Sequence, residues 1–184
     1  MNRFQPLDPA RAEGEAKTLL DAVQAKLGMT PNMTRMMAQS PAVLEGYLAL
    51  AGALAGGKLA AKLREQIALT TAEANACEYC LSAHSLIGRS VGLTPSDVEA
   101  ARDADAADVR AKAALRFSRA LIADRGQVSD ADIARVRGAG FTDGEIGEIV
   151  ANVALNVFTN YFNNVTRPVV DFPHVKPRGL AKAA

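Results

Sequence analysis

The chain has 184 residues, a length typical of one domain or of two small halves that share a core. Hydrophobic residues make up 49% of it and aromatic residues only 5%, a composition of small aliphatic side chains that favours close-packed helices. The formal net charge of +1, from 21 basic and 20 acidic residues, gives no electrostatic reason to expect a nucleic acid or a membrane surface as partner.

Nearly every segment carries a helical pattern. Asp8 is predicted to cap the first helix, with Pro9 at its first position and Gly28 at its end. Ser40 is expected to start another helix, and Asn75 to cap the helix that holds both cysteines. No segment keeps the two-residue alternation of a strand. The expected helices cover residues 8–28, 32–39, 40–57, 59–74, 75–91, 94–102, 107–124, 129–140 and 142–166.

The predicted fold is therefore all-α, with a weak sign of two repeated helical halves that share one core. A shift of 83 residues aligns Cys77 with Asn160 and Cys80 with Asn163, although alanine-rich helices match by chance easily. We expect a single domain made of four parts. These are an N-terminal helical extension (1–28), a core with the cysteine motif (40–92), a second helical half (105–166) and a C-terminal tail (167–184) expected to be frayed at its end.

Two absences bear on location. The first 17 residues contain no apolar stretch of the kind found in a secretory signal. No run approaches the roughly 18 apolar residues of a membrane span. We therefore expect a soluble, cytoplasmic protein. In that reducing compartment a lone C-x-x-C pair is more typical of catalysis or metal binding than of a static disulfide.

The stretch NACEYCLSAHS, residues 75–85, holds both cysteines and one of the two histidines. Its spacing puts Cys77, Cys80 and His84 on one face of a helix. Cys77 is expected in the first turn, where unpaired N–H groups and the helix dipole favour a thiolate. His84 lies one turn after Cys80 and is a potential base for it. Such a pair can attack a peroxide or a disulfide and then close a disulfide itself.

Other interpretations of the stretch stay open at this point. A metal site would use the same three side chains, with Glu65 or Glu73 as a fourth ligand. The chain has no second C-x-x-C, however, and His174 lies near the tail, where we expect it to be exposed and inert. The two thiols could also be purely structural. We favour the redox pair, with no metal and no cofactor.

Glu65 extends the motif. Glu65, Cys77, Cys80 and His84 form the pattern E-x11-C-x2-C-x3-H, which resembles that of the alkylhydroperoxidase D-like branch of the carboxymuconolactone decarboxylase family. Residues 139–164 are similar to the second helical half of its longer, peroxidase-related members. The decarboxylase branch lacks the cysteine pair, which argues against lactone decarboxylation.

The resemblance implies a role for each of the four residues. Cys80 would be the peroxidatic cysteine that becomes a sulfenic acid, and Cys77 its proton donor and resolving partner in a redox-active disulfide. His84 and Glu65 would form the proton relay, which requires that their two helices pack antiparallel. The resemblance also implies an all-helical trimer or hexamer.

Four further residues are candidates for the pocket: Tyr79, Glu73, Asn156 and Asn160. Tyr79 stands where the best-known peroxidase members carry a histidine between the cysteines, and it cannot act as a base near neutral pH because its reference pKa is about 10. Glu73 could instead be a structural contact. The asparagines belong to an amide stripe that is either a buried polar seam or a solvent-facing row, composed of Asn152, Asn156, Asn160, Asn163 and Asn164.

The sequence thus predicts a thiol-dependent peroxidase that forms a homo-oligomer and is restored by an external dithiol. The substrate is left open between hydrogen peroxide, an organic or lipid hydroperoxide and a specific metabolite. Two alternatives remain: a redox-responsive disulfide carrier or binding protein with little turnover, and a transition-metal site.

Overall fold

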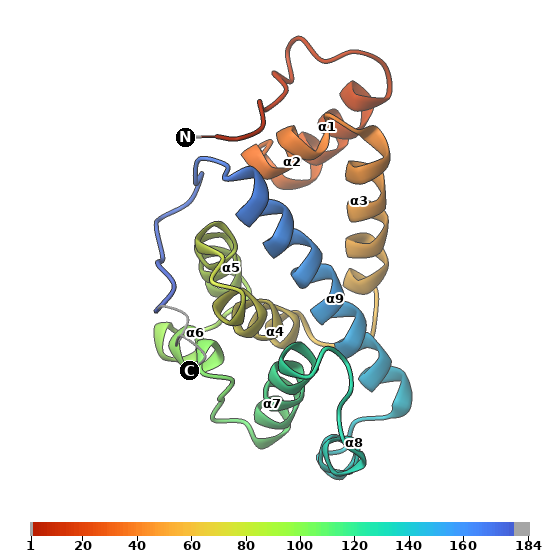
Figure 1. The fold of residues 1–184 in the computed structure, drawn as a ribbon, viewed down its shortest axis with the longest axis vertical. Coiled ribbons are helices and arrows are strands. Elements are labelled where there is room, and N and C mark those ends of the chain that lie inside the picture. The colour runs from red at the N-terminus through yellow and green to blue at the C-terminus, as the bar shows by residue number, and fades with distance from the viewer. Residues whose placement is uncertain (1, 179–184) are drawn as a thin grey trace.

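The computed structural model describes residues 2–178, and within them the chain is helical without a strand (Figure 1). The all-α fold expected from the sequence is confirmed. The helices are α1 (Gly14–Leu27), α2 (Asn32–Met37), α3 (Pro41–Ala55), α4 (Ala61–Ala74), α5 (Glu78–Ser90), α6 (Pro95–Arg102), α7 (Val109–Ala123), α8 (Asp130–Gly138) and α9 (Asp143–Thr166).

Helix α4 lies at the centre of the fold. It packs against α5, α6, α7 and α9, and every residue from Gln66 to Ala72 is buried. A helix buried on all sides needs small or apolar residues around its whole circumference, and the sequence IALTTA after Gln66 supplies them. The long helix α9 crosses the bundle diagonally and contacts α3, α4, α5 and α7 (Figure 1).

One hydrophobic core joins the two halves of the chain. Ile67 and Leu69 of α4 belong to the same buried cluster as Leu115 of α7 and Ile149 of α9. Burial of each such side chain stabilises the fold by about 1.5–3 kcal/mol. The weak sequence repeat does not extend to local structure, because residues 61–90 form two helices and residues 143–166 form one.

Reciprocal hydrogen bonds fix the starts of three helices. At each start, a Ser or Thr hydroxyl accepts the N–H of the residue three positions on, whose carboxylate accepts the N–H of the capping residue. The predicted starts near residues 94, 129 and 142 are therefore correct. The pairs are Thr94 with Asp97, Ser129 with Asp132, and Thr142 with Glu145.

The predicted start of the first helix is wrong. Helix α1 begins at Gly14, and Asp8 instead uses its carboxylate locally, where it accepts the N–H of Ala10 at 3.0 Å. Gly14 has a φ of +57°, a left-handed conformation that glycine adopts without steric cost. The Asp-Pro signal therefore builds a turn before the helix and does not cap it.

The C-terminal segment, residues 167–178, has no helix and runs back over α5 toward α6 (Figure 1). Ser82 of α5 accepts the N–H of Val175 at 2.9 Å, and Arg102 of α6 donates to the carbonyl of Lys176 at 2.9 Å. The expectation of a frayed tail is therefore wrong up to residue 178, and residues 179–184 lie outside the described part. Among residues 2–178, no helix is long and apolar enough to cross a membrane.

Candidate active site

Cys77 is the N-cap of α5, at a sharp turn between α4 and α5. Its Sγ accepts the N–H of Cys80 at 3.3 Å. The prediction that Asn75 caps this helix is wrong, because Asn75 ends α4 and Ala76 turns the chain with a φ of +50°. The thiol sulfur takes the place that the side-chain oxygen of a Ser or Asn usually fills at a helix start.

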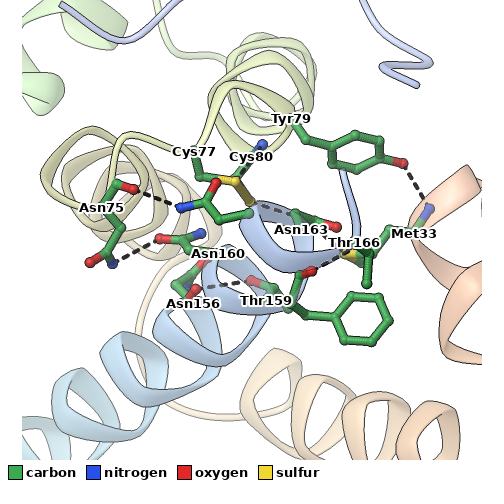
Figure 2. Close-up of a disulfide and its surroundings, with 12 residues drawn as sticks. Met33, Asn75, Cys77, Tyr79, Cys80, Asn156, Thr159, Asn160, Asn163 and Thr166 are labelled. Atoms are coloured by element: carbon green, nitrogen blue, oxygen red, sulfur yellow. Dashed lines mark hydrogen bonds between the residues drawn. A yellow bond between two sulfur atoms is a disulfide. The ribbon is translucent and has the colours of Figure 1, made fainter. Parts of the chain in front are cut away.

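Cys77 and Cys80 form a disulfide, with their Cα atoms 5.3 Å apart (Figure 2). This separation lies within the usual range of about 4.4–6.8 Å. Cys77 is 0% exposed and Cys80 is 3% exposed. The two sulfurs differ in what they face, since Cys80 lines a cavity and Cys77 does not.

The cavity has a volume of about 510 Å³ and lies between α2, α3, α4, α5 and α9. Its polar lining includes Cys80, Glu65, His84 and Asn156. Its remaining walls are mostly apolar, as is usual for sites that take small organic molecules. The larger apolar side chains in these walls include Leu27, Met33, Leu54, Ile87, Leu155 and Phe172.

Glu65 and His84 meet across the α4–α5 hairpin. Glu65 Oε2 lies 2.8 Å from His84 Nδ1, and the side chains are 17% and 22% exposed. A neutral imidazole in this geometry donates its Nδ1–H to the carboxylate and keeps the lone pair on Nε2. Within residues 2–178, no hydrogen bond joins His84 to either sulfur, so this base would act on a group held in the cavity.

The hydroxyl of Tyr79 makes two hydrogen bonds. The hydroxyl donates to Asp171 Oδ2 at 2.6 Å. It also accepts the backbone N–H of Met33 at 3.2 Å (Figure 2). Burial, and then the hydrogen bond to the Asp171 carboxylate, raise the pKa of Tyr79 far above its ordinary value. Its ring packs edge-on against Phe172, with ring centroids 5.6 Å apart. Tyr79 is thus a neutral anchor for the C-terminal segment, and Phe172 of that segment is a wall of the cavity.

Four of the five asparagines in the amide stripe of α9 are buried, and Asn163 lies against the cysteine pair (Figure 2). Asn163 donates its Nδ2 to Cys80 Sγ at 3.2 Å. Asn160 accepts Asn75 Nδ2 at 3.0 Å and is 0% exposed, whereas Asn156 lines the cavity. The stripe is therefore the buried polar seam, and Asn164 at its end is exposed.

Glu73 and His174 lie away from the cavity lining. The Glu73 carboxylate accepts Arg102 Nε at 2.6 Å and the backbone N–H of Arg178 at 2.7 Å, so it ties α4 to α6 and to the C-terminal segment. His174 is exposed, as expected, and pairs with Glu78 at 2.8 Å. Among residues 2–178, no group of three or more His, Cys, Asp or Glu side chains is arranged to hold a metal ion.

Sequence reasoning left three contributors to the site without a role: Asn163, Asp171 and Tyr47. Asn163 was visible only as one member of the amide stripe. Tyr47 lines the cavity, and its pKa is raised by burial and by the nearby Glu65 carboxylate. Asp171 lies 92 residues from Tyr79 in a segment without periodic pattern, so no local signal could have paired them.

The structure is an all-helical bundle with a C-x-x-C disulfide beside a mostly apolar cavity. Residues 41–123 match the model of the carboxymuconolactone decarboxylase family. This match and the structural relatives described next support a relationship to the alkylhydroperoxidase D-like branch of that family.

Two peroxidase-related proteins of known structure are similar over nearly their whole length. One, from Ralstonia eutropha JMP134 and described as an alkylhydroperoxidase core, is 27% identical with a TM-score of 0.81, over 91% of this chain and 92% of the relative. The other, from Silicibacter sp. TM1040, is 26% identical with a TM-score of 0.78, over 92% and 94%. The debrominase Bmp8 has the same fold, at 21% identity and a TM-score of 0.78 over 92% of each chain. No curated protein matches the sequence significantly.

Proposed function

We propose that the protein is a thiol-dependent peroxidase in which Cys80 attacks the substrate and Cys77 resolves the product. The observation that carries this proposal is the asymmetry of the pair. Cys80 lines the cavity, whereas Cys77 is fully buried at the helix N-cap and within disulfide reach of it. This arrangement supports Cys80 as the residue that meets the substrate and Cys77 as the residue that closes the disulfide.

The reaction balances without a cofactor. The Cys80 thiolate attacks the terminal peroxide oxygen, the O–O bond breaks, and the sulfur loses two electrons to become a sulfenic acid. His84 takes up the proton that the Cys80 thiol releases on ionisation, and Glu65 stabilises the resulting imidazolium. The imidazolium then protonates the alkoxide, which leaves as an alcohol. Cys77 then attacks the Cys80 sulfur, releases water and forms the disulfide. An external dithiol, oxidised in turn, restores both thiols.

The cavity favours an organic hydroperoxide over hydrogen peroxide. Hydrogen peroxide needs no apolar walls, whereas a space of about 510 Å³ lined by Met33, Leu155 and Phe172 suits a substrate with an apolar body. We keep the cytoplasm as the proposed compartment, because each turnover needs a dithiol reductant.

The test uses fully reduced protein and one equivalent of cumene hydroperoxide, with thiols counted by mass spectrometry. We expect the Cys77–Cys80 disulfide and one equivalent of alcohol. Cys77→Ser should stop at a Cys80 sulfenic acid that dimedone traps, and Cys80→Ser should consume no peroxide. A Cys80→Ser variant that consumes peroxide at the wild-type rate would refute the proposal, whereas disulfide formation without turnover on added dithiothreitol would favour a disulfide carrier.

Two substitutions test the relay. His84→Gln and Glu65→Gln should each slow peroxide reduction at neutral pH, because one removes the proton carrier and the other the carboxylate that orients it. If the two act as a unit, the double variant should be no slower than the slower single variant. Fully additive losses would show that the residues act separately.

Reductive dehalogenation is a second candidate. Bmp8, whose fold this chain shares, is described as a debrominase and has been captured with 2,3,4-tribromopyrrole. A dithiol supplies the two electrons that replace a carbon–halogen bond by carbon–hydrogen, with release of halide and formation of the disulfide. Bromide release from a bromopyrrole, measured beside peroxide consumption, distinguishes the two activities.

We also propose that the protein is a homo-oligomer that associates through α9. One face of α9 exposes Val150, Phe158, Tyr161 and Val165, with 40–58% of each residue accessible, and these residues follow a helical repeat. Light scattering after size exclusion should give a multiple of 19.3 kDa for the protein and a smaller species for Tyr161→Lys. A monomer at micromolar protein concentration would contradict the proposed association through α9.

A further inference from the structure

Three buried side-chain atoms in the described part of the chain have no hydrogen-bond partner: Ser85 Oγ, Asn160 Nδ2 and Asn163 Oδ1. Such atoms are rare in folded proteins, because each costs free energy that folding must offset. Ser85 belongs to α5, whereas the two asparagines lie one turn apart on α9, and Asn163 contacts Cys80. The two asparagines therefore point to a local function beside Cys80.

Asn163 has the most telling geometry of the three. It is 3% exposed, and its Nδ2 lies 3.2 Å from Cys80 Sγ and 3.2 Å from Met33 Sδ. A disulfide sulfur and a thioether are both weak acceptors. In the oxidised protein this amide therefore donates only to weak acceptors, and its own oxygen has no hydrogen-bond partner. A thiolate in the same place would be a far stronger, charge-assisted acceptor.

The two sulfurs receive their N–H donors from different sources. Cys77 Sγ accepts from the backbone of Cys80 at the start of α5, where the helix itself favours negative charge. Cys80 lies three residues further along, where that effect has faded. The side chain of Asn163 supplies the donor that the helix does not.

The position of Asn163 is fixed from one turn away. Asn160 accepts Asn75 Nδ2 at 3.0 Å, and Asn164 donates to the Asn75 carbonyl at 2.9 Å. These contacts hold the α4–α5 turn against α9, so that Asn163 faces Cys80. Asn160 is thus a positioning residue, and the buried asparagines of α9 orient Asn163 in addition to packing against α4 and α5.

We propose that Asn163 is a catalytic residue that donates a hydrogen bond to the Cys80 thiolate and so stabilises the reactive form of the reduced protein. This inference rests on the proposed role of Cys80 as the attacking thiol. It concerns the ionisation of that thiol and not the identity of the substrate. It can therefore be tested without a peroxide.

The test is the rate of alkylation of Cys80 by iodoacetamide between pH 5 and 10, in reduced protein with Cys77→Ser as background. Asn163→Leu removes the donor at similar volume. Since hydrogen bonds to charged groups are worth more than neutral ones, we expect the apparent pKa of the Cys80 thiol to rise by about one unit. The rate at neutral pH should then fall about tenfold.

A matched control separates this effect from a general loss of packing. Asn152→Leu changes the same residue type in the same buried stripe, but Asn152 donates to the Glu148 carbonyl and not to sulfur. It should leave the alkylation profile unchanged. Should Asn163→Leu fail to fold, as judged by circular dichroism, Asn163→Ala is titrated in its place.

The outcomes are distinct. An unchanged profile in the Asn163 variant, or an equal shift in Asn152→Leu, would overturn the inference. A raised thiol pKa in a protein that consumes no peroxide would leave the inference standing and refute the proposed peroxidase function instead.

Discussion

The hydroxyl of Tyr79 joins three parts of the chain, and Tyr79→Phe removes only that hydroxyl. The variant loses the donor to Asp171 and the acceptor for the Met33 N–H. The edge-on packing of the ring against Phe172 is kept, because the two side chains share their carbon frame. The substitution therefore isolates the hydrogen bonds from the shape of the residue.

The cost follows from the burial of each partner. The Met33 N–H is buried and would be left without an acceptor, which costs about 1–3 kcal/mol. Asp171 is exposed and keeps its bond from the Asn32 N–H, so water can replace Tyr79 there and the loss is about 0.5–1 kcal/mol. Together these give about 1.5–4 kcal/mol of lost stability. For a chain of this length the melting temperature should fall by about 3–16 °C.

Thermal and urea unfolding of the oxidised protein measure this loss. Tyr161→Phe is the matched control, because Tyr161 is 58% exposed and its variant should unfold within about 0.5 kcal/mol of the parent. Hydrogen exchange should also speed up in residues 169–176 of the Tyr79 variant. A Tyr79→Phe protein with the parent's midpoint and unchanged exchange would refute the view that this tyrosine anchors the C-terminal segment.

Three other substitutions test the electrostatics of the fold. The N–H of Thr142, followed by Arg110, lowers the pKa of Glu145 from 4.5 to about 2, so its contribution to stability is present above pH 4.5 and is lost as the pH falls toward about 2. In Glu145→Gln the unfolding midpoint should therefore depend less on pH across that window, and an unchanged dependence would contradict this linkage. Arg102→Ala leaves the Glu73 carboxylate, 12% exposed, without its ion pair and should cost about 3–5 kcal/mol in urea unfolding. Arg135 pairs with Asp132, but its side chain is 71% exposed, so Arg135→Ala should cost at most about 1 kcal/mol. Similar losses of stability in the two arginine variants would contradict the view that burial decides the strength of these ion pairs.

The features that the sequence predicted well are those set by local physics. The helix starts near residues 94, 129 and 142 follow from a hydroxyl and a carboxylate three residues apart, and the structure contains each of these hydrogen bonds. The contact of Glu65 with His84 follows from helical phase once the two helices pack antiparallel. The roles of these two residues and of the cysteines in a reaction stay predictions.

The features that the sequence did not predict depend on distant partners or on unusual use of a residue. Asn75 has the chemistry of an N-cap, yet the turn at Ala76 places Cys77 there, and the amide of Asn75 goes to α9 instead. Glu73 was a candidate for the pocket, but Arg102, 29 residues away, draws its carboxylate to α6. The hydrogen-bond partners of these two side chains cannot be predicted without knowing how helices far apart in the chain pack together.

The complete burial of Cys77 has a kinetic consequence. Under the proposed function, a reducing thiol would have to enter the cavity and attack Cys80, with Cys77 as the leaving group, because Cys77 is 0% exposed. The Cys80 N–H beside Cys77 Sγ then stabilises the departing thiolate. Oxidant and reductant would share one entrance and exclude each other, which gives substituted-enzyme kinetics with parallel double-reciprocal plots. At high concentration, a bulky peroxide substrate should inhibit its own turnover by blocking the access of the reductant to Cys80.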